Sequence, residues 1–107
     1  MTTFDKREEA FEEKFAHEEE NKFKATARRN KMLGLWAAEK LGLRGAEADS
    51  YALAIVMAAF EDTSGHAVAG KIRDDFNAKG VAQSDHQIAR TMSEFMAKAI
   101  DDIKAGR

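Results

Sequence analysis

The sequence has no cysteine and no proline, and only one tryptophan and one tyrosine among its 107 residues. Without cysteine the chain can form no disulfide framework and no cysteine-ligated zinc site, and it has no thiol nucleophile. No apolar run approaches the roughly 20 residues that a membrane span requires. The N-terminal residues also lack the pattern of a secretory signal peptide. We therefore expect a cytoplasmic protein without direct membrane insertion.

Charge is abundant instead: 34% of the residues are charged and 44% are apolar. The net charge of −2 conceals a segregation along the chain. Residues 1–20 hold three basic and eight acidic side chains, residues 21–44 hold seven basic and one acidic, and residues 45–107 hold seven basic and ten acidic. An acidic head, a basic neck and a near-neutral body suggest three physical roles. The simpler interpretation is that both charged blocks are solvated helix faces.

The spacing of apolar residues predicts helices throughout the body, and no segment alternates with the period of two that is typical of a strand. We expect four of them, at about residues 20–41, 47–61, 66–79 and 85–104. Short connections favour antiparallel neighbours, so the predicted fold is all-α, a compact four-helix bundle over residues 20–107.

Particular residues support these helices. Ser84 and Gln87 have the spacing of a capping box at the start of the fourth helix. The apolar positions of the second and third helices fall on one stripe each, formed by Ala52, Leu53, Val56, Met57 and Phe60, and by Val68, Ile72 and Phe76.

The first helix is apolar all round between Met32 and Ala38, so it should be buried on more than one side. Gly34 costs about 1 kcal/mol against alanine in a helix interior, which indicates that it permits the close approach of another backbone. Trp36 is best explained as a core anchor, and exposure to a partner is the alternative.

The acidic head carries Phe4, Phe11 and Phe15 within roughly 40° of one another on a helical wheel. Like-charged neighbours at i, i+4 weaken a helix here, and a single helix this short is marginal in water. We therefore predict that residues 1–19 form a mobile N-terminal arm. Its aromatic ridge either folds into a partner's groove on binding or covers the protein's own bundle.

The sequence gives no reason to expect catalytic residues, a metal site or a cofactor, because its three histidines are far apart and its serines lie in no nucleophile elbow. The segment Gly65–Lys71 matches the phosphate-loop pattern G-x-x-x-x-G-K, but Ile72 stands where serine or threonine should follow, and no strand precedes it. We interpret it as part of a helix.

The basic neck places Lys24, Arg28 and Lys31 on one face, which could line phosphates. The adjacent acidic head and a pI near 5.9 argue against nucleic acid, for which a pI above 9 is typical. Two alternatives stay open: a regulatory domain that binds an adenine nucleotide weakly through Lys71 or the neck, and a generic helical adaptor.

Two stretches closely resemble the ζ-subunit family of alphaproteobacterial rotary ATP synthases. They read Phe15-Ala16-His17-Glu18-Glu19-Glu20 and Ala27-Arg28-Arg29-Asn30-Lys31-Met32-Leu33-Gly34-Leu35-Trp36-Ala37-Ala38-Glu39-Lys40-Leu41-Gly42. Members of that family inhibit the ATPase activity of the catalytic head and have a four-helix fold with a mobile inhibitory arm. The resemblance thus implies a non-enzymatic inhibitor, peripheral at the inner membrane through the ATP synthase.

The resemblance further implies that the arm enters a cleft between a catalytic β subunit and its α neighbour, close to the γ shaft. The inhibitory contacts would then come from the arm, with the phenylalanines as anchors and the cations at the rim: Phe4, Lys6, Arg7, Phe11, Lys14 and Phe15. Candidates for a secondary contact are Lys24, Arg28, Lys31 and Trp36.

Overall fold

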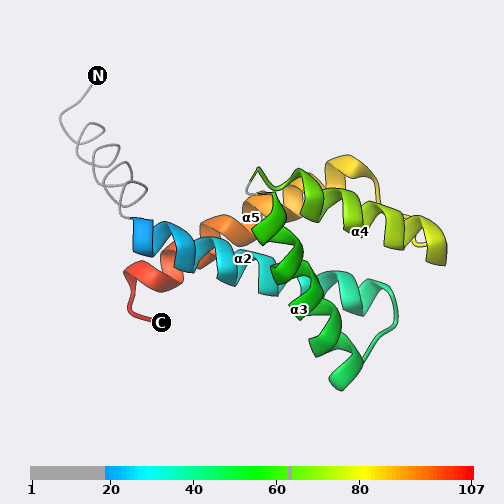
Figure 1. Ribbon diagram of the computed structural model, residues 1–107, viewed down its shortest axis with the longest axis horizontal. Coiled ribbons are helices and arrows are strands. Elements are labelled where there is room, and N and C mark those ends of the chain that lie inside the picture. Colours follow the sequence, from blue (N-terminus) through cyan, green and yellow to red (C-terminus); the bar gives the residue numbers. More distant parts are fainter. Residues whose placement is uncertain (1–18, 63) are drawn as a thin grey trace.

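A computed structural model describes residues 19–62 and 64–107 of the chain. These residues form four helices and no strand, which confirms the predicted all-α class (Figure 1). The helices are α2 (Glu19–Lys40), α3 (Ala46–Glu61), α4 (His66–Lys79) and α5 (Asp85–Lys104). The predicted division into an arm and a domain falls at the edge of the described residues and stays a prediction.

Helix α2 is the central element, and it packs mainly against α3 and α5. Helix α5 runs back along α2, so the C-terminus lies beside the beginning of α2 (Figure 1). Nη2 of Arg28 on α2 donates a hydrogen bond of 2.7 Å to the backbone oxygen of Arg107 there. Helix α3 crosses α2 steeply, and α4 lies against both α3 and α5. The apolar stretch at the C-terminal half of α2 is therefore covered on more than one side, as expected.

The core consists of fully buried side chains from all four helices: Leu33, Ala37, Ile55, Val68, Ile72, Phe76 and Ile88. The stripe predicted for α4 is confirmed, because Val68, Ile72 and Phe76 are all fully buried. Trp36 meets the Phe76 ring edge-on, with ring centroids 5.6 Å apart and an interplanar angle of 66°, a favourable aromatic geometry. Trp36 is partly buried against the core, which supports its interpretation as an anchor.

Gly34 allows α2 and α3 to approach each other closely. A Cβ atom added at this position would lie 2.6 Å from the Cα of Ala52 and 3.3 Å from its carbonyl oxygen. Both atoms belong to the backbone, so no side-chain rotation could relieve such a contact. The close approach that the sequence predicts for Gly34 is present, and its partner is Ala52.

The stripe predicted for α3 is wrong in its orientation. Ala52 is buried, and so is Ile55, which the predicted stripe leaves out. Leu53, Met57 and Phe60 are instead exposed. Helix α3 is apolar around most of its circumference, so periodicity alone does not select the buried face. The close contact between Ala52 and Gly34 selects it.

The capping box at the start of α5 is confirmed. The Ser84 hydroxyl accepts a hydrogen bond of 3.1 Å from the Gln87 amide, and the Gln87 side-chain oxygen accepts one of 2.8 Å from the Ser84 amide. Such reciprocal bonds satisfy two backbone donors that would otherwise lack partners at a helix start.

Candidate functional site

The six residues predicted for the inhibitory contact lie outside the described residues. They are Phe4, Lys6, Arg7, Phe11, Lys14 and Phe15. Their roles stay predictions. The described part of the molecule that follows them in the sequence is the beginning of α2, at Glu19.

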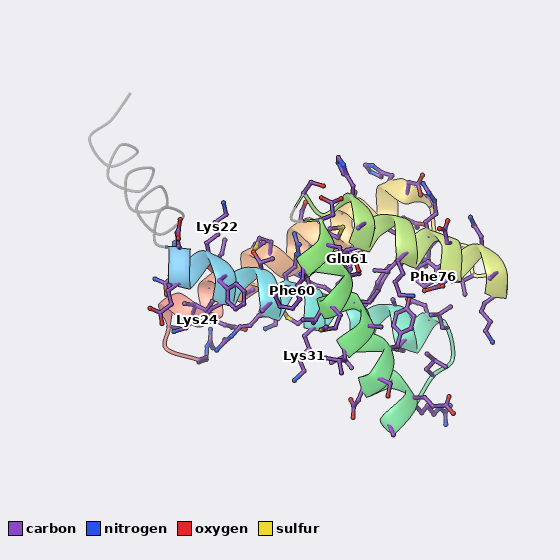
Figure 2. The ribbon with its side chains drawn as sticks, viewed as in Figure 1. Lys22, Lys24, Lys31, Phe60, Glu61 and Phe76 are labelled. Carbon is purple, nitrogen blue, oxygen red and sulfur yellow. The ribbon has the colours of Figure 1, made fainter. Side chains whose placement is uncertain are left out.

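The three neck cations predicted as secondary contacts all lie on α2, and their role stays a prediction. Lys24 pairs with Glu20 at 3.1 Å, and Arg28 is engaged by the C-terminus. Lys31 is exposed and extends from α2 on the side away from Lys22 (Figure 2). Two of the three predicted neck cations therefore already have partners within the chain.

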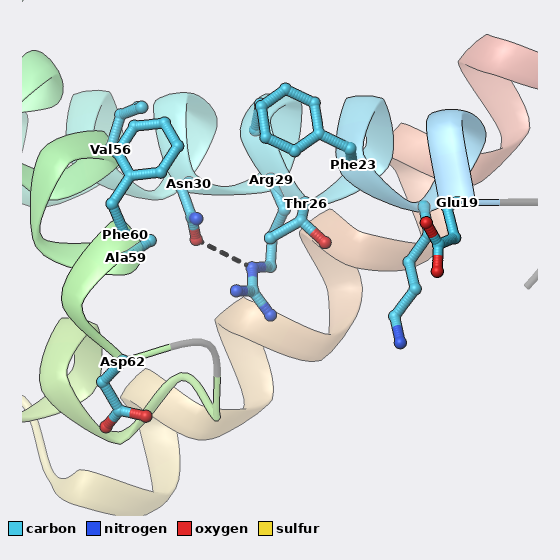
Figure 3. Close-up of a pocket in the computed structure, with 11 residues that line it drawn as sticks. Glu19, Phe23, Thr26, Arg29, Asn30, Val56, Ala59, Phe60 and Asp62 are labelled. Atoms are coloured by element: carbon cyan, nitrogen blue, oxygen red, sulfur yellow. Dashed lines mark hydrogen bonds between the residues drawn. The ribbon is translucent and has the colours of Figure 1, made fainter.

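A groove opens between the N-terminal half of α2 and the last turns of α3, with a volume of about 420 Å³. Its apolar wall is headed by Phe23 of α2 and Phe60 of α3, each 61% exposed. The two rings lie 6.3 Å apart between centroids at an interplanar angle of 37°. Val56 and Ala59 complete the wall on the α3 side (Figure 3). Large exposed aromatic side chains beside a groove are typical of surfaces that bind partners.

The polar wall of the groove contains Arg29 and Asn30. Asn30 is buried, with 1% of its surface exposed, and its side-chain oxygen accepts a hydrogen bond of 3.0 Å from Nε of Arg29 (Figure 3). Burial lowers the pKa of Arg29. Among residues 19–62 and 64–107, no carboxylate lies within ion-pair distance of this guanidinium. Toward the rest of the described chain, the half-buried guanidinium thus has most of its five hydrogen-bond donors available for a ligand.

Sequence reasoning missed this groove. Phe23 and Phe60 are 37 residues apart in the sequence, and only the crossing of α2 and α3 brings their rings together. One signal was available: an apolar α3 with more large side chains than one buried stripe can hold must expose some of them.

The segment Gly65–Lys71 is not a phosphate loop. It forms the first turns of α4, where the Ala69 amide already donates to the Gly65 carbonyl oxygen. Nζ of Lys71 lies 3.1 Å from Asp75 and 5.5 Å from the centre of the Tyr51 ring. A phosphate-binding loop needs free backbone donors, so the geometry gives the nucleotide alternative no support at Lys71.

The beginning of α4 is held by Asp62. One of its carboxylate oxygens accepts bonds from the hydroxyl and amide of Ser64, at 2.6 and 2.9 Å, and the other accepts from the Ala67 amide at 3.2 Å. These hydrogen bonds, that of the Ser64 hydroxyl foremost, lower the pKa of Asp62. The carboxylate lies at the rim of the groove, but its hydrogen bonds are made to residues at the start of α4.

No group of three or more potential metal ligands occurs among residues 19–62 and 64–107. In the same residues no helix is both long enough and apolar enough to cross a bilayer.

Comparisons with known proteins give two findings. A family model described as "ATPase inhibitor subunit zeta" matches residues 1–102. A protein structure solved by solution NMR is 36% identical to this chain and superposes with a TM-score of 0.69; the match covers 79% of this chain and 96% of that chain. No curated protein matches at a significant level.

Proposed function

Because the chain belongs to the ATPase inhibitor subunit zeta family, we propose that it is a non-enzymatic inhibitor of ATP hydrolysis by the catalytic head of a rotary ATP synthase. The observation that most supports this proposal is the extent of the family match. It covers residues 1–102, which include the acidic segment as well as the helices. The protein would then be peripheral at the inner membrane through its partner.

The inhibitory element in this proposal is the N-terminal arm, residues 1–19. It enters an interface between a catalytic β subunit and its α neighbour near the γ shaft, and folds there as a helix anchored by Phe4, Phe11 and Phe15. A rotary motor must open and close this interface in sequence. A ligand that binds one state of the interface better than the others stalls the cycle.

The four helices act as a rigid body that carries the arm. Helix α2 begins where the arm ends, and the Gly34–Ala52 contact together with the core fixes α2 relative to the other helices. A bulky body attached to an inserted helix also limits how far the arm can enter.

Deleting residues 1–19 tests the proposal. We expect inhibition of ATP hydrolysis by purified catalytic head to disappear, while the thermal unfolding of the four helices stays nearly unchanged. Retained inhibition would move the active surface to the helices. A collapsed unfolding transition would show that the arm is part of the core.

A single substitution tests the aromatic anchors. Phe11→Ala should weaken inhibition by about 2 kcal/mol, or roughly 30-fold in the inhibition constant, if Phe11 is a buried anchor. Leu53→Ala is the matched control, because Leu53 is an exposed apolar side chain of α3 that does not line the groove. An unchanged constant for Phe11→Ala, or an equal loss for Leu53→Ala, would contradict the anchor role.

A further inference from the structure

The groove between α2 and α3 combines two features that an unoccupied protein surface rarely keeps together. Phe23 and Phe60 expose most of their rings on one wall. On the other wall, Arg29 is half-buried and has no carboxylate partner among the described residues. Exposed aromatics favour an apolar ligand, and a partly desolvated guanidinium favours a carboxylate. The groove therefore fits an amphipathic segment that is both aromatic and acidic.

We propose that this ligand is the protein's own segment 1–18, which docks its phenylalanine ridge in the groove while the protein is free. The consequence for inhibition rests on the function proposed above, whereas the docking itself does not. The segment would then have two binding sites, the groove in the resting protein and the catalytic interface in the inhibited complex.

Position and length support this occupant. Glu19, the first residue of α2, itself lines the groove, so the segment enters at the edge of its own binding site. The lining residues on α2 run from Glu19 to Asn30, a distance of about 17 Å along a helix. A helical stretch from Phe4 to Phe15 has the same length of about 17 Å. The three residues between Phe15 and Glu19 suffice for a connection between antiparallel helices.

Charge also supports it. Residues 1–18 carry six acidic and three basic side chains, and residues 21–44 of the neck carry seven basic and one acidic. On a helical wheel Glu8 and Glu12 lie within about 60° of the phenylalanine ridge. When the ridge faces Phe23 and Phe60, these carboxylates lie beside it, on a side that can face Arg29.

Docking in the groove would lower the apparent affinity for the ATPase. Only protein molecules with a free arm can bind the ATPase, so the apparent affinity falls in proportion to the fraction of such molecules. A groove that holds the arm nine-tenths of the time would weaken inhibition about tenfold. The groove thus acts as an internal competitor of the catalytic interface.

A spin-label experiment on the full chain tests the docking. Because the protein has no cysteine, Ala10→Cys provides a single attachment site, about 120° away from the ridge on the wheel. We expect the label to broaden the amide signals of Val56 and Phe60, on the groove side, far more than that of Ala105, which ends α5 beside the beginning of α2. Equal broadening on both sides would mean an undirected arm and would overturn the proposal.

Two variants and one mixing experiment sharpen the result. Phe60→Ser should abolish the broadening at Val56, whereas Leu53→Ser, on the same helix but outside the groove, should leave it unchanged. Broadening that survives Phe60→Ser would contradict docking in the groove. In the mixing experiment, an isotope-labelled chain without a spin label is combined with a spin-labelled chain without isotopes. If broadening occurs between the two chains and not within one chain, the groove binds the arm of another copy, and the proposal is overturned.

Inhibition assays separate this inference from the proposed function. Phe60→Ser should lower the concentration needed for half-maximal inhibition severalfold, because it frees the arm. A loss of inhibition would show that the groove contacts the ATPase and would overturn the docking role. If deletion of residues 1–19 leaves inhibition intact, the proposed function fails, while the spin-label result still decides the docking.

Discussion

Helices α2 and α3 meet at two places that differ in character. At Gly34 and Ala52 the two backbones lie so close that even a methyl group would not fit between them. At Phe23 and Phe60 the same helices meet through two exposed rings, with a groove beside them. The second place lies about 17 Å from the first along α2, since eleven residues separate Gly34 from Phe23.

Residue size explains the difference. Two helices that cross at a point of contact diverge on either side of it, so the smallest residues belong at the crossing and larger ones must bridge the gap farther out. Glycine at the crossing brings the axes together. The rings of Phe23 and Phe60 span the wider end but leave it open to solvent. The feature that stabilises the fold thus also creates the surface that we propose to be functional.

The largest effect is expected at the closed end. Gly34→Ala should destabilise the protein by about 3 kcal/mol, because the new methyl group meets the Ala52 backbone and the two helices must separate. Denaturant unfolding measures the change. Gly70→Ala is the matched control in the interior of α4, where an added Cβ meets no atom within 4 Å. It should stabilise the protein by about 0.5–1 kcal/mol. Equal effects of the same sign would contradict the crossing.

The closed end was largely predictable from the sequence, and the open end was not. A glycine in the middle of an apolar helical stretch already indicates a close helix contact, since it weakens the helix and needs a compensating reason. Val68, Ile72 and Phe76 recur every four residues and are the only large apolar side chains of α4, which leaves one choice of buried face. Each of these two sequence patterns lies within a single helix.

The orientation of α3 and the groove depend on two helices at once. The apolar residues of α3 surround most of the helix, so the exposure of Leu53, Met57 and Phe60 follows from the contact at Ala52 and not from their spacing. Whether Phe23 meets Phe60 depends in addition on the crossing angle. No pattern within either segment encodes that angle.

Tyr51 tests whether a hydrogen bond from α3 to α4 also stabilises the position of α3. Its hydroxyl donates a hydrogen bond of 2.7 Å to Asp75 on α4. Tyr51→Phe should destabilise the protein by about 1.5 kcal/mol at neutral pH, because the bond has an ionised acceptor. No change in the urea midpoint would mean that packing alone fixes α3.

The same bond predicts an alkaline pH dependence. Burial, the hydrogen bond and the charge of Asp75 together raise the pKa of Tyr51 above its usual 10.0. The contribution of Tyr51 is therefore fully present below pH 10 and is lost progressively above it, where the unfolded chain ionises first. Tyr51→Phe should reduce the loss of stability above pH 10. An unchanged alkaline slope would contradict the assignment.

At the open end, Phe60→Ser should change stability by about 1 kcal/mol or less. Phe60 is 61% exposed, and serine and phenylalanine have similar helix propensities. The measurement is the same denaturant midpoint as for Gly34→Ala. A loss as large as that of Gly34→Ala would show that the aromatic pair is part of the core, and the contrast between the two ends would disappear.

The smallest effect concerns Asp62, which ends α3 at the rim of the groove and is held by surface hydrogen bonds instead of packing. Because its folded pKa is lowered below the usual 3.8, its contribution is present above that pH and is lost as the pH falls below it. Asp62→Asn should therefore flatten the decline of the thermal midpoint at acidic pH. Asp101→Asn removes an exposed acid on α5 as the control. If both variants retain the full decline, the bonds of Asp62 do not stabilise the start of α4.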